Sequence, residues 1–209
     1  MSHLDQKQSW RQRLGWLAGE LIVVFAGVSA EFVVENYRDN RNQINEMHQA
    51  VVGIITELKE TESKTRTFSD AILANIARWE DADRVGKRAV PGYYRIPGAP
   101  HPRSAAWNSA VASGVVRMLE PKLRRDLGYF YSEFVGIHDN YDRYNQFTER
   151  EVLPKALSGP DAFYGPDGHL LPAFRVHMNL QKEFAQDLRR LGTMAHDLRG
   201  RLEAVQSSK

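Results

Sequence analysis

The stretch LGWLAGELIVVFAGVSAEFVV spans residues 14–34 and determines the architecture that the sequence predicts. As an α-helix rising about 1.5 Å per residue, it is about 30 Å long, the thickness of the hydrocarbon layer of a bilayer. Trp10 and Trp16 lie near one end and Tyr37 near the other, as amphipathic rings do at the two membrane interfaces. We therefore expect a single transmembrane helix that follows a cytoplasmic tail of residues 1–13.

Basic side chains flank this run on both sides. Lys7, Arg11 and Arg13 precede it, and Arg38 and Arg41 follow it. The small basic excess on the N-terminal side favours a cytoplasmic N-terminus, because positive charge is retained on that side of the membrane. The sequence thus predicts a single-pass protein of a bacterial inner membrane, with its remaining residues in the periplasm.

Two other interpretations of the run stay open. Val28, Ser29 and Ala30 resemble the small-residue cleavage site of a secretory signal peptide, although Glu20 interrupts the apolar core that such a peptide needs. Glu20 and Glu31 are both costly in lipid, so a buried helix of a soluble protein is the second alternative.

The two glutamates of the run share one helix face. At about 100° per residue, Glu20 and Glu31 lie within about 20° of one another, with Gly27 on the same stripe. An ionised carboxylate at the bilayer centre costs about 2.5–3.5 kcal/mol, so Glu20 is expected in a helix–helix interface or in a proton or ion path. The alternative is that Glu20 only hydrogen-bonds to a neighbouring helix or extends its carboxylate toward the membrane surface. Small residues beside it allow another backbone to approach closely. The predicted membrane contact surface comprises Gly19, Glu20, Ala26, Gly27, Ala30 and Glu31.

Residues 19–27 (GELIVVFAG) and residues 35–41 (ENYRDNR) together carry a resemblance. They resemble the start of an uncharacterised bacterial family of small single-pass membrane proteins, with a G-E-aliphatic run, a second glycine and an N-[WY]-x-[ED]-x-R exit. Glu31 departs from the family pattern, in which that position is apolar. A looser likeness continues at Trp107, Ser113, Gly114, Leu123, Leu127 and Tyr131. The resemblance implies a membrane anchor and brings no chemistry with it.

The region 35–209 is predicted to be a helical soluble domain. After residue 40, apolar side chains recur every three or four positions, which predicts an amphipathic helix that continues the membrane helix. These side chains are Ile44, Met47, Val51, Ile54, Ile55, Leu58, Phe68, Ile72, Ile76 and Trp79. Polar residues 60–67 weaken the stripe and predict a kink or a less buried turn. We expect the helix to stop near Val85 and Gly86.

Residues 86–103 (GKRAVPGYYRIPGAPHPR) hold four prolines and three glycines, which exclude a helix. Ser104 is the expected N-cap of a short helix that ends near Gly114. Aromatic and arginine side chains are favoured binding anchors, which makes this loop the best candidate for recognition. The alternative is that the loop folds over the bundle and buries its rings. The candidate cluster is Tyr93, Tyr94, Arg95, His101, Arg103 and Trp107.

Two further long helices are predicted. One begins at Pro121 and carries an aromatic stripe through Leu153, expected to pack into the core. The other follows a turn-rich connection, residues 158–172, and reaches Val205. No alternation of period two is visible, so the sequence predicts an all-α fold in which a single N-terminal transmembrane helix continues into an antiparallel helical bundle.

The composition and motifs limit the function. Basic residues number 28 and acidic residues 26, so no general positive field favours nucleic acid, and cysteine is absent. His138 and Asp142 have a spacing that could share a metal, but no Glu-x-x-His motif accompanies them. Phosphate-binding and nucleophile motifs are missing as well. We expect no enzyme, metal or cofactor.

The function predicted from these features is that of a membrane-anchored interaction protein, a subunit, scaffold or sensor. Its expected partners are membrane lipid and either further copies of itself or a membrane-protein complex. The alternative is a channel or energy-coupling subunit that uses Glu20.

Overall fold

The computed structural model describes the backbone of residues 5–92 and 103–207. Within the first of these ranges it describes the side chains of residues 37–38 and 41–92. The described backbone is helical apart from turns, connecting segments and one isolated antiparallel bridge between Tyr164 and Leu170, so the predicted all-α fold is confirmed.

The described residues contain five α-helices. They are α1 (Asp5–Arg84), α2 (Ala105–Ala112), α3 (Pro121–Phe147), α4 (Leu153–Leu157) and α5 (Pro172–Ser207). The chain divides into two compact units, Met1–Glu46 and Met47–Lys209, and the second unit contains the bundle.

Helix α1 ends where the sequence predicted. Gly86 has a φ of 71°, in the left-handed region that only glycine adopts without strain. Its N–H donates to Asp83 O at 2.9 Å, and the N–H of Lys87 donates to Ala82 O at 2.9 Å. These two hydrogen bonds form a Schellman motif, which satisfies the carbonyls at the end of the helix.

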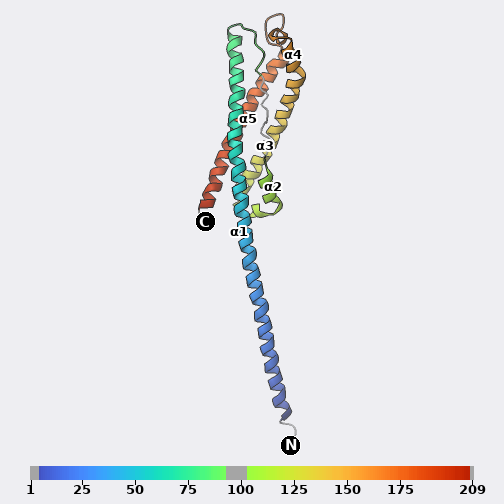
Figure 1. Ribbon diagram of the computed structural model, residues 1–209, viewed down its shortest axis with the longest axis vertical. Coiled ribbons are helices and arrows are strands. Elements are labelled where there is room, and N and C mark those ends of the chain that lie inside the picture. Colours follow the sequence, from blue (N-terminus) through green and yellow to red (C-terminus); the bar gives the residue numbers. More distant parts are fainter. Residues whose placement is uncertain (1–4, 93–102, 208–209) are drawn as a thin grey trace. The chain divides into compact units, whose positions relative to one another are not determined.

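The long helices of the second unit run antiparallel along α5 (Figure 1). Along α1, Asp70 is paired with Arg189 and Glu80 is paired with Lys182, so residue numbers increase in opposite directions along α1 and α5. Helix α3 is also antiparallel to α5: Tyr141 contacts Phe184, and Phe147, further along α3, contacts the earlier Phe174. The antiparallel bundle is therefore built from α1, α3 and α5.

Polar residues 60–67 do not weaken the packing of α1, so that part of the prediction was wrong. Helix α1 continues through them, and Thr61 and Thr65 are buried, with Ser69 one turn further on. Each hydroxyl is satisfied: Thr65 Oγ1 donates to Thr61 O at 2.7 Å, and Ser69 Oγ donates to Ala185 O at 2.8 Å. The apolar stripe of α1 is thus continued by small hydroxylated side chains.

The helix that begins at Pro121 is interrupted earlier than expected. Helix α3 ends at Phe147, a π-helical turn follows at Thr148–Val152, and α4 begins at Leu153. Thr148 and Val152 are buried, which fixes the widened turn against the core. Such turns are rare and occur often at functional sites.

The predicted transmembrane span, residues 14–34, lies on the backbone of α1, but its side chains lie outside the described residues. Among the residues that are described, no helix is both long enough and apolar enough to cross a bilayer.

Candidate functional site

Two of the six predicted recognition residues fall in the described chain. Arg103 Nη1 forms an exposed ion pair with Glu60 Oε2 at 3.0 Å. Trp107 stacks on Tyr131, with ring centroids 5.2 Å apart and planes at 10°. The remaining members of the cluster, Tyr93, Tyr94, Arg95 and His101, lie outside the described residues.

Glu57 of α1 joins this region to the bundle, a role that the sequence did not reveal. Its side chain is 9% exposed. Tyr131 Oη donates to Glu57 Oε2 at 2.7 Å, and the N–H of Ala106 donates to Glu57 Oε1 at 2.8 Å. Burial, reinforced by Glu57, raises the pKa of Tyr131, so its hydroxyl stays a donor. Ser104 is the N-cap residue of α2, as predicted, but its hydroxyl makes no cap hydrogen bond, and Glu57 accepts from the first turn of α2 instead.

The predicted membrane contact surface belongs to the N-terminal part of α1. Its members, Gly19, Glu20, Ala26, Gly27, Ala30 and Glu31, have side chains outside the described residues. Their backbone belongs to α1.

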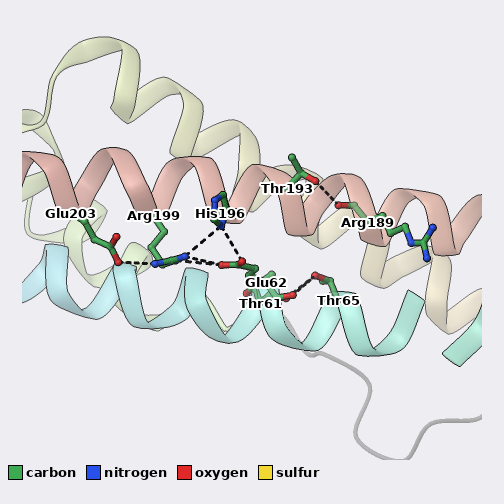
Figure 2. Close-up of polar contacts among 8 residues, drawn as sticks. All are labelled: Thr61, Glu62, Thr65, Arg189, Thr193, His196, Arg199 and Glu203. Carbon is green, nitrogen blue, oxygen red and sulfur yellow. Dashed lines mark hydrogen bonds and ion pairs between the residues drawn. The ribbon is translucent and has the colours of Figure 1, made fainter. Parts of the chain in front are cut away.

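The first candidate site is the α1–α5 seam, the line of polar contacts between these helices drawn in Figure 2. Glu62 of α1 is its centre. Its Oε1 lies 3.0 Å from Nδ1 of His196, and its Oε2 lies 3.2 Å from Nη2 of Arg199. Arg199 Nη1 also reaches Glu203 Oε1 at 2.9 Å, so one guanidinium joins two carboxylates. Burial raises the pKa of Glu62, but His196 and Arg199 outweigh it and leave the pKa below its usual 4.5.

A polar hollow of about 460 Å³ opens beside this seam. Its lining residues are Glu62, Arg66, Asp70, Arg189, Gly192, Thr193 and His196. Most of its charges already meet an opposite charge, as in the 2.8 Å pair between Asp70 and Arg189. A charged ligand would have to displace these pairs, which makes the seam better suited to hold the two helices than to hold a ligand.

The second candidate is the α3–α5 hollow, an open cavity of about 590 Å³ on the bundle surface. Its lining is mostly aromatic and aliphatic, and it consists of Asn140, Arg143, Tyr144, Phe147, Pro172, Ala173, Val176, His177 and Leu180. Ligand sites of small molecules have volumes of about 300–1,000 Å³ and a similar mixture of apolar walls and a few polar groups. The π-helical turn Thr148–Val152 begins directly after Phe147.

His177 is the most unusual residue of this hollow. It is 3% exposed, stacks on Phe147 with centroids 4.4 Å apart, and its Nε2 has no hydrogen-bond partner among the described residues. Burial lowers the pKa of His177 to about 4, so the imidazole is neutral at pH 7. A buried polar atom without a partner costs about 1–3 kcal/mol, and such atoms are rare in native proteins.

The spacing of His138 and Asp142 had suggested a shared metal. His138 Nε2 lies 4.0 Å from Asp142 Oδ2, which is longer than a hydrogen bond. In residues 5–92 and 103–207, no three histidine, cysteine or acidic side chains come together as metal ligands.

The comparisons with known proteins returned no matching family model, no matching curated protein and no matching solved structure. The family resemblance of residues 19–41 therefore stays a prediction.

The sequence did contain a signal for the α3–α5 hollow. Asn140, Arg143, Tyr144 and Phe147 have the i, i+3, i+4, i+7 spacing of one helix face, and Ala173, Val176, His177 and Leu180 repeat it. Val176 and Leu180 widen the apolar face of α5 beyond the side that Phe174 and Met178 bury in the core. When the apolar face of a helix is wider than the side that packs in the core, the sequence predicts that part of this face is exposed.

Proposed function

We propose that the chain is a membrane-anchored interaction protein, a subunit, scaffold or sensor held by residues 14–34. The carrying observation is that this run of bilayer length lies on the same unbroken helix, α1, that enters the bundle. A helix satisfies its own backbone hydrogen bonds, which is the condition for an apolar run to face lipid.

The proposal assigns the two parts different roles. Residues 14–34 anchor the chain in a bacterial inner membrane and contact lipid and a second membrane helix through the face of Glu20 and Gly27. The bundle lies in the periplasm. Glu57 and Glu62 are each held by donors within the fold, which favours a binding role for the bundle over proton transfer.

Alkaline carbonate extraction tests the anchor. The full chain should stay in the membrane pellet, and Val24→Lys should move it toward the supernatant, because a lysine near the bilayer centre costs about 2.5–3.5 kcal/mol. Val85→Lys is the matched control, since Val85 is 77% exposed just beyond the end of α1. Release of the wild-type chain by carbonate would overturn the proposal.

The orientation has its own test, made simple by the absence of cysteine. A single cysteine introduced by Val85→Cys should react with a membrane-impermeant maleimide in cells whose outer membrane is permeabilised. Reaction only after the inner membrane is lysed would place the bundle on the cytoplasmic side and overturn the periplasmic assignment.

Assembly is tested by blue-native electrophoresis of the chain in a mild detergent. The wild type should migrate as an oligomer or a larger complex, and Gly27→Leu should shift it toward the monomer, because a large side chain keeps helices apart. A monodisperse wild-type monomer in nanodiscs would overturn the interaction role.

A second function, a channel or energy-coupling subunit, is favoured by one observation, the acid Glu20 inside an apolar run. In that case Glu20→Gln should abolish ion flux in proteoliposomes while assembly persists. Equal flux in the two proteins would remove this alternative.

A further inference from the structure

The α3–α5 hollow has a direction along its length. Helices α3 and α5 are antiparallel, so Asn140 and Arg143 lie toward the Leu180 end, whereas Phe147 lies toward the end at Pro172. From Ala173 to Leu180 the helix rises about 10 Å, roughly the length of an extended chain of eight to ten carbons. One end of the hollow is therefore polar and basic, and the rest is apolar.

The apolar part is only partly covered by the fold. Val176 is 57% exposed and Leu180 is 39% exposed, although both line the same hollow as Phe147. Apolar side chains gathered around a concave surface mark a binding site more often than single exposed ones do.

The polar end offers hydrogen-bond donors that the fold does not use. Among the described residues, Arg143 donates only to the side-chain oxygen of Asn140 and meets no carboxylate. The hydroxyl of Tyr144 makes no hydrogen bond to a described residue. Burial, with Glu183 and Asp187, raises the pKa of Tyr144 and keeps that hydroxyl protonated. The hollow thus presents a guanidinium and a phenol beside an apolar channel.

We propose that the α3–α5 hollow binds a single-chain carboxylate amphiphile, a medium-chain fatty acid, with its carboxylate at Arg143 and its chain along Phe147 and Val176. Arginine matches carboxylate geometry with two parallel donors, and the apolar walls bury the chain. This deepens the proposed function by making the bundle the ligand-binding part of a sensor, and it rests on that function only for the sensor role.

Two acidic residues near Tyr144, Glu183 and Asp187, bear on whether the hollow can accept an anionic head group. Asp187 Oδ1 lies 3.2 Å from Nη2 of Arg190, which offsets part of its charge because Glu133 Oε2 shares that nitrogen at 3.3 Å. Glu183 is exposed to water, which screens its charge. Arg143 is the charge that lines the hollow itself. A carboxylate should therefore bind better than an alcohol or a quaternary ammonium with the same chain.

Photo-crosslinking with decanoate that carries a diazirine at its chain end tests the site. The full chain is used in phosphatidylcholine nanodiscs, and the labelled peptides are mapped by mass spectrometry. Labels should concentrate on the segments that hold Phe147 and Val176. Val176→Trp should fill the hollow and lower labelling by more than about tenfold, whereas Val135→Trp, at a 50% exposed position of α3 outside the hollow, should leave it unchanged.

Competition tests the head group. Unlabelled decanoate should compete better than decanol or decyltrimethylammonium, and Arg143→Gln should lower labelling about fivefold while Arg175→Gln does not. Even labelling along the chain, or full labelling of Val176→Trp, would overturn the site. Equal or better competition by decanol or by the ammonium would overturn the carboxylate assignment.

The outcome is separable from that of the anchor. Carbonate extraction tests the membrane anchor, residues 14–34, and does not depend on the hollow. The same labelling experiment can be carried out on protein recovered from a soluble fraction. A chain that leaves the membrane yet labels at Phe147 and Val176 would overturn the anchor and support the ligand.

Discussion

Helix α5 packs its two sides by different means. Toward α1 it presents small groups: Ala185 O accepts from Ser69, and Gly192 lies so close to Thr65 that an added Cβ would meet Oγ1 at 2.8 Å. Toward α3 it presents large rings such as Phe184, whose centroid lies 5.2 Å from that of Tyr144.

This difference determines which side of α5 has an open surface that could bind a ligand. Small side chains let two backbones approach closely, and the charged residues at the edge of the α1–α5 seam then pair with one another. On the other side, rings of α3 and α5 border the α3–α5 hollow, where Arg143 lines the polar end and His177 Nε2 has no hydrogen-bond partner among the described residues. The seam is therefore the structural contact and the hollow the functional candidate, and three predictions probe that division.

The largest effect should come from His177 on the ring side. Its pKa of about 4 in the fold, against 6.5 when unfolded, means that the folded state binds fewer protons between these values. Stability is therefore unaffected above pH 6.5 and falls as the pH drops through this window. At about 1.4 kcal/mol per pKa unit, the loss of unfolding free energy by pH 4 is about 3 kcal/mol.

Denaturant unfolding followed by near-UV circular dichroism measures this slope. His177→Phe keeps a ring against Phe147 and cannot titrate, so the difference between the two proteins should grow from pH 6.5 to pH 4. A constant difference across that window would show that His177 is open to water and would remove it from the buried wall of the hollow.

The second prediction addresses the close approach on the α1 side. Gly192→Ala should lower the free energy of unfolding by about 2 kcal/mol, because Thr65 is fully buried and its hydroxyl is held by a 2.7 Å hydrogen bond to Thr61 O. Gly200→Ala on the same helix is the matched control: a Cβ there meets nothing, so it should stabilise the fold by about 0.5–1 kcal/mol.

A double-mutant cycle identifies the cause. Thr65→Ala removes the atom that the new Cβ would meet, so Gly192→Ala should cost much less in that background. An equal cost in both backgrounds would mean that the approach of α1 and α5 does not depend on this pair.

The helices were predictable from the sequence because each has a local cause. Gly86 ends α1 through its positive φ, and Pro121 begins α3 at the position where a missing N–H costs nothing. The seam was not predictable in the same way. Thr65 looks like part of a polar interruption until Gly192 of α5, more than a hundred residues away in the sequence, is seen to pack closely against it.

The candidate site was predictable only in part. Trp107 was singled out from its loop, but its stacking on Tyr131 and the capping of α2 by Glu57 depend on packing between distant segments. The ring stripe of α3 was correctly expected in the core. The helical spacing of Asn140, Arg143, Tyr144 and Phe147 indicated a shared face, but the π-helical turn that follows Phe147 has no signature in the sequence, so the hollow beside that face could not be predicted.

The smallest effect should come from the charges of the seam. Glu62→Gln removes the attraction of His196 and Arg199, and because these contacts lie at the protein surface the loss should be about 1 kcal/mol or less. The pKa of Glu62 is lowered in the fold, so its contribution is present above pH 4.5 and is lost as the pH falls below that value.

Salt and pH together distinguish this pairing from packing. The difference between wild type and Glu62→Gln should shrink in 1 M salt, where screening acts over about 3 Å, and should vanish at low pH because Glu62 is then protonated in both states. Asp81→Asn is the control, since the pair that Asp81 forms with Arg84 is exposed on both sides and should contribute nothing measurable. A loss of unfolding free energy above 2 kcal/mol that salt does not reduce would mean that Glu62 is part of the packing of the seam, as Thr65 and Gly192 are. The difference between the two sides of α5 would then depend on charge as well as on side-chain size.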